Sequence, residues 1–242
     1  IVRTTNNGQT WILVNSPVTQ LIHIAAVDLN TAWVCGGNPI GRIFKTTDGG
    51  SNWVEQTYSP ASYINNIYFF NANTGIFITD QVAGVYGFFI TRNGGNTWTR
   101  SPNSPAGSTV LTDNRMGVLD TNLVWYVAYT TGGYKLLKLT GGLNNAWVSL
   151  PFMNNSSMTN VLFKDMNNGL ASDGYKIQVT TNGGLNWNLR NDSATGIGNV
   201  GSFIHIPSTD WVLIKSGYGV RISFNFCITW QPLVIINDAG GY

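Results

Sequence analysis

An eight-residue segment that ends in tryptophan recurs six times along the chain, and this repetition constrains the fold more than any other feature of the sequence. Four copies are clear: TTNNGQTW at 4–11, TTDGGSNW at 46–53, TRNGGNTW at 91–98 and TTNGGLNW at 180–187. Two degraded copies, TGGLNNAW and SFNFCITW, occupy 140–147 and 223–230. The tryptophans are separated by 42, 45, 49, 40 and 43 residues. A period of about 40–45 residues is typical of the blades of a β-propeller, which have four strands each.

Within each period, three stretches rich in β-branched and aromatic residues precede the repeated segment, and a fourth strand starts at its tryptophan. In the second period these stretches are 64–70, 76–79 and 88–90, with turn residues at 71–75. No part of the chain has a sustained apolar period of 3.6 residues, so we expect helices to be nearly absent. The sequence therefore predicts the all-β class, as a β-propeller of four-stranded antiparallel blades.

The ends of the chain do not complete a whole number of blades. Five full periods run from Trp11 to Trp230, while residues 1–11 supply one further strand of the repeat and 231–242 suffice for one outer strand. We therefore expect a single propeller domain over 1–242, six-bladed, with five complete blades and one incomplete blade. Closing the ring would need either flanking sequence or another chain. Because the first residue is Ile1 and not Met, we expect a processed chain or a fragment of a longer one.

The repeated segment resembles the Asp-box, or BNR, repeat, whose general form is Ser/Thr-x-Asp-x-Gly-x-Thr-Trp. That repeat is shared by sialidases, sortilin-type receptor domains, xyloglucan-degrading hydrolases and the photosystem II assembly factor group. The fuller blade is similar to that of the last group, and the resemblance covers nearly the whole chain. It implies the propeller fold but no single function, because the families that share the repeat do unrelated things.

The residues of the repeated segment have a structural explanation. A side-chain oxygen at its third position can accept hydrogen bonds from backbone N–H groups across its own turn, and the glycines allow a positive φ. We expect the tryptophan to fill the space between neighbouring sheets, and the segments to act as structural turns and not as metal or sugar sites. The residues assigned to this role are Asn6, Asp48, Asn93, Asn182 and Asn225, together with Trp11, Trp53, Trp98, Trp147, Trp187 and Trp230.

Composition argues against several kinds of partner and location. Only 10% of residues are charged and the 13 Lys and Arg residues are scattered, so we expect no nucleic-acid partner. The longest apolar run, 21–27, is far shorter than the ~20 residues needed to cross a bilayer, so we expect no membrane insertion. The low charge and the many Asn and Thr residues favour a secreted, periplasmic or cell-surface location.

Histidine and cysteine do not form the pattern of a metal site. The two His and two Cys residues are spread over the chain, so we expect neither a zinc site nor a disulfide framework, and no cofactor. We expect His23 and His205 to line the core or a channel and Cys35 to be a buried apolar residue. Cys227 stands where other copies have glycine, and we interpret its turn as one released from constraint.

Tyrosine recurs just before the expected third strand of several blades, at Tyr86, Tyr175 and Tyr218, with Tyr134 one position away. The loops that carry these residues are rich in glycine and uncharged, and we expect them on one face of the propeller. Exposed tyrosines can stack on sugars or anchor a protein partner. The alternative is that each ring packs on the next blade. We take the four tyrosines as the candidate ligand-binding residues.

The sequence favours a non-catalytic binding or assembly scaffold whose partner is a protein or a neutral glycan. The alternative is a carbohydrate-directed propeller, either a lectin or a sialidase-like or glycoside hydrolase-like enzyme. A sialidase would need a Tyr–Glu pair and an arginine triad, yet Glu55 is the only glutamate and no arginine lies in an Arg-Ile-Pro motif. Two-carboxylate glycoside chemistry could draw on Asp80, Asp120 and Asp173. Their spacing indicates no pair, so we assign no catalytic residue.

Overall fold

The computed structural model describes residues 1–234 apart from 7, 38–39, 60–61, 108–114, 152–157, 159, 191–199, 201, 207 and 217–218. The described residues form strands and turns, with no α-helix among them, and hence none that could cross a membrane. The chain divides into two compact units, Ile1–Thr112 with Leu143–Ala146, and Asp113–Gly142 with Trp147–Tyr242. Each unit is described by itself below.

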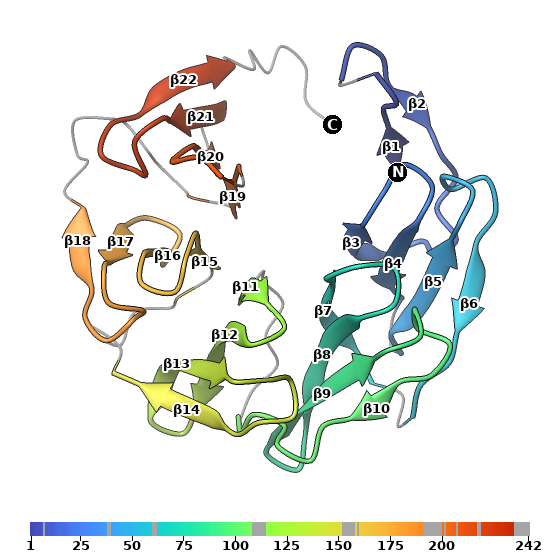
Figure 1. The fold of residues 1–242 in the computed structure, drawn as a ribbon, viewed down its shortest axis with the longest axis horizontal. Coiled ribbons are helices and arrows are strands. Elements are labelled where there is room, and N and C mark those ends of the chain that lie inside the picture. Colours follow the sequence, from blue (N-terminus) through green and yellow to red (C-terminus); the bar gives the residue numbers. More distant parts are fainter. Residues whose placement is uncertain are drawn as a thin grey trace. The chain divides into compact units, whose positions relative to one another are not determined.

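The first unit contains a two-stranded sheet and two four-stranded sheets (Figure 1). The two-stranded sheet, hereafter the partial blade, consists of β1 (Val2–Arg3) and β2 (Ile12–Leu13). The first blade consists of β3 (Leu21–Ala26), β4 (Ala32–Gly36), β5 (Arg42–Thr46) and β6 (Val54–Gln56). The second blade consists of β7 (Ile64–Phe69), β8 (Gly75–Val82), β9 (Val85–Thr91) and β10 (Thr99–Arg100).

The second unit contains three four-stranded sheets. The third blade consists of β11 (Met116–Asp120), β12 (Leu123–Thr130), β13 (Gly133–Thr140) and β14 (Trp147–Leu150). The fourth blade consists of β15 (Asn160–Phe163), β16 (Gly169–Ser172), β17 (Ile177–Thr180) and β18 (Asn188–Arg190). The fifth blade consists of β19 (Ser202–His205), β20 (Val212–Ser216), β21 (Gly219–Ser223) and β22 (Gln231–Val234).

Each complete blade pairs its four strands in chain order, and every pair is antiparallel. The strands are rich in β-branched and aromatic residues, and their middle strands are almost wholly buried, as in β8 and β9. The predicted all-β class and the five four-stranded blades are confirmed. The partial blade has the place that the sequence predicts for the incomplete blade, whereas six blades as the total for a closed ring stays a prediction.

Each repeated segment forms a turn, hereafter a repeat turn, and in five of the six copies the turn is held by its own side chains. The copy at 140–147 has glycine at the third position. In the second blade, Thr91 Oγ1 accepts hydrogen bonds from the N–H groups of Asn93 (3.3 Å) and Gly95 (2.8 Å) and donates to Asn93 Oδ1 (3.0 Å). Asn93 Oδ1 also accepts from the Thr97 N–H at 2.9 Å. The copies that begin at Thr4, Thr46 and Thr180 repeat this pattern, so a hydroxyl and an Asx oxygen satisfy the backbone of the turn.

The degraded copy at 223–230 keeps the same hydrogen bonds, which corrects the expectation that its turn is released from constraint. Ser223 Oγ accepts from the Cys227 N–H at 2.8 Å, and Asn225 Oδ1 accepts from the Thr229 N–H at 2.9 Å. Phe226 and Cys227 consequently adopt φ values of 47° and 68°, at two positions where three of the four clear copies have Gly-Gly. The hydrogen bonds of this turn therefore hold two side-chain-bearing residues in a conformation that favours glycine.

The tryptophans at the ends of the repeat turns differ in burial. Trp187 and Trp230 are buried, and Trp53, Trp98 and Trp147 are half-buried. Trp11 is 59% exposed, which departs from the expectation that every tryptophan fills a space between sheets. It belongs to the partial blade, whose two strands give the indole little to pack against.

Two further tryptophans, Trp33 and Trp125, lie outside the repeat turns and each contact the blade that follows their own. In the first unit, Trp33 on β4 is fully buried and stacks on Phe69 of the second blade, with 3.5 Å between ring centroids and 7° between planes. Its Nε1 donates to the carbonyl of Gly94 at 3.2 Å. The Nζ of Lys45 lies 5.0 Å from the centroid of the indole. One side chain thus combines stacking, a buried hydrogen bond and a cation–π contact.

The second unit repeats this arrangement between the third and fourth blades. Trp125 stacks on Phe163 at 3.7 Å and 6°, its Nε1 donates to Gly183 O at 3.3 Å, and Lys138 Nζ lies 5.1 Å from its ring centroid. In register, Trp33 faces Lys45 and Trp125 faces Lys138. The first and third blades therefore each use a tryptophan and a lysine at equivalent positions to make the same contact with the blade that follows.

His23 and Cys35 face each other between β3 and β4. Cys35 is fully buried, as expected, and burial raises the pKa of its thiol to about 12. The Nδ1 atom of His23 is buried. Burial lowers the pKa of His23, and a hydrogen bond with the Ile67 backbone opposes that shift. His23 is therefore held in its neutral form inside the first unit.

The repeat turn of the second blade gives a test of the hydroxyl. Thr91→Val should lower the free energy of unfolding by about 1–3 kcal/mol, because two backbone N–H groups lose their acceptor and one of them, that of Gly95, is buried. Thr99→Val on exposed β10 is the matched control and should change little. Urea unfolding followed by tryptophan fluorescence measures both, and an equal stability of the two variants would contradict the assignment.

His23 makes stability depend on pH. Because its pKa is lower in the folded than in the unfolded state, its stabilising effect is complete above the unfolded value of about 6.5. The effect is lost as the pH falls below that value toward the folded-state pKa. We expect the Tm to fall between pH 7.5 and pH 5.5, and to fall less in His23→Asn. Thermal unfolding followed by circular dichroism tests this, and identical falls would exclude His23 as the cause.

Candidate functional site

The four predicted tyrosines do not form one exposed group. Tyr86 on β9 is fully buried, and the close fit of its ring against Gly107 would place a Cβ there only 1.9 Å from Cε2. The backbone N–H of Tyr86 donates to Pro105 O at 2.9 Å, and a β-bridge joins Val85 to Ala106. The expectation that Tyr86 is a surface contact is therefore wrong, because the segment around Pro105 covers it.

The other tyrosines differ from Tyr86 and from each other. Tyr134 is half-buried, with an edge-to-face contact to Tyr129 at 4.8 Å and the Arg115 guanidinium 5.2 Å from its ring centroid. Tyr175 is 73% exposed at the turn between β16 and β17, where its N–H donates to Asp173 Oδ1 at 2.9 Å. Tyr218 lies outside the described residues. Among the described tyrosines, Tyr175 is thus the most exposed.

The acidic residues considered for glycoside chemistry have local partners. Arg42 forms a bidentate ion pair with Glu55 on the surface, at 2.7 and 2.5 Å, and this hydrogen bonding lowers the pKa of Glu55. Burial raises the pKa of Asp80, whose Oδ1 accepts from Asn65 Nδ2 at 3.0 Å. Asp120 and Asp173 accept backbone hydrogen bonds within their own turns. These contacts account for the carboxylates structurally, and they bring none of the four into a pair.

Metal ligands are likewise not gathered. In the part of the chain that the structure describes, no three His, Cys, Asp or Glu side chains lie close enough together to hold a metal ion. His205 Nε2 donates a hydrogen bond to the carbonyl of Thr209 at 2.8 Å, and Cys227 is buried. His205 and Cys227 therefore have structural surroundings, while the expectation of no zinc site stays a prediction.

The partial blade carries a group of exposed apolar side chains. Val2 pairs with Leu13, so the two side chains lie on one face of the sheet, where they are 61% and 80% exposed. Trp11, 59% exposed, is two residues from Leu13, while Ile12, 55% exposed, lies on the other face with Arg3. Clusters of exposed apolar side chains mark sites of interaction more often than isolated ones do. This surface is therefore the strongest candidate for a binding site in the described residues.

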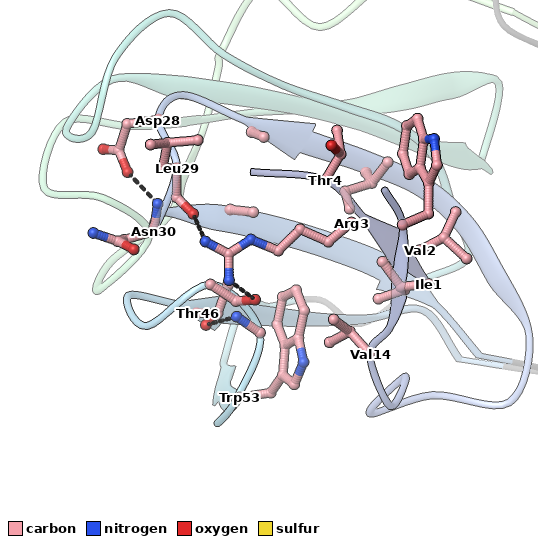
Figure 2. Close-up of a pocket in the computed structure, with 16 residues that line it drawn as sticks. Ile1, Val2, Arg3, Thr4, Val14, Asp28, Leu29, Asn30, Thr46 and Trp53 are labelled. Atoms are coloured by element: carbon pink, nitrogen blue, oxygen red, sulfur yellow. Dashed lines mark hydrogen bonds between the residues drawn. The ribbon is translucent and has the colours of Figure 1, made fainter. Parts of the chain in front are cut away.

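A cleft of about 220 Å³ lies between the partial blade and the first blade (Figure 2). Its lining includes Arg3, Trp11, Ile24, Ala26, Gly49 and Trp53. Arg3 reaches into it, where Nη1 donates to Gly49 O at 3.1 Å and Nη2 to Leu29 O at 2.6 Å. The cleft is therefore apolar along its walls and carries one cation whose hydrogen bonds are satisfied by backbone carbonyls.

The strand β3, which borders the cleft, is more exposed than the equivalent strand of the second blade. In the second blade the innermost strand, β7, is buried almost throughout, because the first blade packs against it. In the first blade, β3 leaves Leu21 39% and Ile24 45% exposed, since the partial blade provides no inner strands to cover them. Sequence reasoning missed this site, although the Arg3-Thr4 and Lys45-Thr46 pairs before two repeat turns were a signal for it.

Comparison with known proteins supports the fold. No protein-family model and no curated protein matches the sequence. A solved structure described as YCF48 bound to D1 peptide is 20% identical, with a TM-score of 0.68 over 98% of this chain and 76% of its own. YCF48 from Cyanidioschyzon merolae is 19% identical, with a TM-score of 0.66 over 94% and 77%. The GH74 enzyme of Niastella koreensis is 15% identical, with a TM-score of 0.52 over 87% and 46%.

These likenesses show the β-propeller fold for this chain. They confirm the resemblance to photosystem II assembly factor and GH74 propellers at the level of fold, while the assignment of the repeat turns to the Asp-box family stays a prediction. At identities of 20% and below, the chemistry of those proteins is not carried over to particular residues here. What the chain shares with them is an antiparallel four-stranded blade, repeated along the sequence.

Proposed function

We propose that the protein is a non-catalytic binding or assembly scaffold whose partner is another protein. The observation that carries this proposal is the apolar surface of the partial blade, where Val2, Ile12 and Leu13 are each more than half exposed. Paired strands with such side chains are a surface on which a polypeptide can bury apolar area. The low charge of the chain agrees with a contact that depends on burial and not on ion pairs.

A structural neighbour supports the same class of partner. One of the similar propellers, YCF48, is described as bound to a D1 peptide, so a propeller with this arrangement of blades can hold a peptide. We extend to this chain only the class of partner, a polypeptide. For its location we propose a secreted, periplasmic or cell-surface site, on the basis of low charge and abundant Asn and Thr.

The second candidate is a neutral glycan bound at Tyr175, and the exposure of that ring is what favours it. Tyr175→Ala should then abolish binding on a glycan array while changing the free energy of unfolding by less than about 1 kcal/mol, as is usual for exposed positions. Tyr134, which is half-buried, would contribute less. A glycan array probed with both proteins decides the point, since unchanged or absent glycan binding excludes this candidate.

Selection of a phage-displayed peptide library on the immobilised protein tests the proposed function. We expect enrichment of peptides whose binding is lost in Val2→Lys/Leu13→Lys, because two ammonium groups would have to be buried at the contact. The control is Val148→Lys/Leu189→Lys, which alters exposed apolar residues of the second unit and should leave binding intact.

Two results would overturn the proposed scaffold. The first is enrichment that survives Val2→Lys/Leu13→Lys but not the control, because the contact would then lie elsewhere. The second is turnover of fluorogenic glycosides that disappears when Asp80 is replaced by Asn. Circular dichroism and the Tm of each variant show that the comparison is made between folded proteins.

A further inference from the structure

The cleft beside the partial blade is the counterpart of the pockets that hold Trp33 and Trp125. Arg3 on β1 pairs with Ile12, the residue after Trp11. Lys45 pairs with Val54 and Lys138 with Val148, which likewise follow the tryptophans of their repeat turns by one residue. Arg3 is therefore equivalent to Lys45 and Lys138 in the architecture of a blade.

The surroundings of Arg3 confirm this equivalence. Arg3 Nη1 approaches to 2.0 Å the position that a Cβ on Gly49 would take. Lys45 Nζ stands in the same relation to Gly94 at 2.8 Å. Lys138 Nζ stands in that relation to Gly183 at 3.0 Å. The carbonyls of Gly94 and Gly183 accept the indole N–H groups of Trp33 and Trp125, so Gly49 O, which lines the cleft, is the matching acceptor.

At the position equivalent to Arg3, the type of residue on the third strand of a blade correlates with the type of residue that faces it on the second strand. The facing pairs of the five complete blades are Trp33 with Lys45, Ile76 with Ile90, Trp125 with Lys138, Leu170 with Val179, and Leu213 with Ile222. A cation faces tryptophan in both blades that carry one, and an aliphatic residue faces an aliphatic residue in the other three. The partial blade carries Arg3 at this position, and by this pattern the side chain expected to face it is tryptophan.

One difference makes the cleft suitable for a reversible partner. Trp33 and Trp125 are locked by Phe69 and Phe163, which lie opposite glycine in register. At the equivalent point of the first blade, Ala26 faces Ala32. An indole in the cleft would thus have no aromatic ring to stack on. Arg3 meanwhile donates hydrogen bonds to two backbone carbonyls. The site is satisfied without an occupant and binds one less firmly than the interior pockets do.

We propose that the protein partner adds an extended strand to the edge of β1 with which no described strand pairs, and inserts a tryptophan side chain into the cleft. This rests on the proposed function and specifies the chemistry of its partner. The indole lies against Ile24 and Ala26 with the Arg3 guanidinium over its face, and its N–H donates to Gly49 O once Arg3 Nη1 has moved from that carbonyl. Strand addition supplies main-chain hydrogen bonds, and the tryptophan supplies selectivity.

A pair of synthetic peptides tests the proposal. The first carries the β12 sequence, LVWYVAYT, between paired lysines for solubility, and the second replaces its tryptophan by leucine. By fluorescence anisotropy we expect the tryptophan peptide to bind about tenfold more tightly, the size of a good cation–π contact. Arg3→Lys, which copies the first and third blades, should keep this preference, whereas Arg3→Ile, which copies the other three, should abolish it.

Matched variants separate the cleft from the rest of the surface. Ile24→Glu should prevent binding of the tryptophan peptide, and Leu189→Glu, equally exposed but in the second unit, should not. Equal affinity for the two peptides, or loss of preference in Arg3→Lys, would overturn the proposal. If library peptides bind at Val2 and Leu13 without tryptophan preference, the proposed function stands and this inference fails.

Two further results would assign the cleft to another occupant and so overturn the proposal. A concentration-dependent dimer in sedimentation velocity that Ile24→Glu abolishes would identify a second copy of the chain. Failure of the peptide to bind a longer form of the chain, when residues 1–242 alone bind it, would identify flanking sequence as the natural occupant.

Discussion

The hydroxyl at the start of a repeat turn is the contact on which most of the structure depends. In five copies it accepts hydrogen bonds from the N–H groups two and four positions further on, while the Asx oxygen closes the second half of the turn. This sets the passage from the third strand to the fourth. It also directs a glycine carbonyl of the turn toward the preceding blade, where it accepts the indole N–H of Trp33 or Trp125. The hydrogen bonds that close the turn thus also orient the carbonyl that contacts the preceding blade.

The partial blade shows what happens where a repeat turn has no complete neighbour. Its repeat turn is intact, and Trp11 Nε1 donates to Gly8 O at 3.1 Å, yet the indole remains largely exposed. Arg3 reaches Gly49, as the equivalent lysines reach Gly94 and Gly183, but without an indole beneath it. Apolar surface and a satisfied cation consequently meet in one cleft. This combination is the physical basis of the binding role proposed above.

The period of the tryptophans was enough to predict the fold class and the number of complete blades. The residues that close each repeat turn are contiguous in the chain, so the turn can be recognised from the sequence. Burial was harder to predict where it depends on distant segments. Tyr86 lies in a glycine-rich stretch that reads as a surface loop, but residues near Pro105 cover it. Cys227 seemed to mark a relaxed turn because its glycine is missing, whereas Ser223 and Asn225 keep the turn closed. The cleft was not predicted, because recognising it requires a comparison of residues that face each other across strands. Those pairs are known only once the register of the strands is known.

The proposed binding mode requires that the cleft receives an indole. The most direct measurement is the nuclear Overhauser spectrum of the protein with a tryptophan-bearing strand peptide, with methyl groups of isoleucine and alanine labelled. We expect contacts from the indole protons to the Ile24 and Ala26 methyls, together with slower amide exchange in β1. Contacts to residues outside the cleft, with unchanged exchange in β1, would contradict that binding mode.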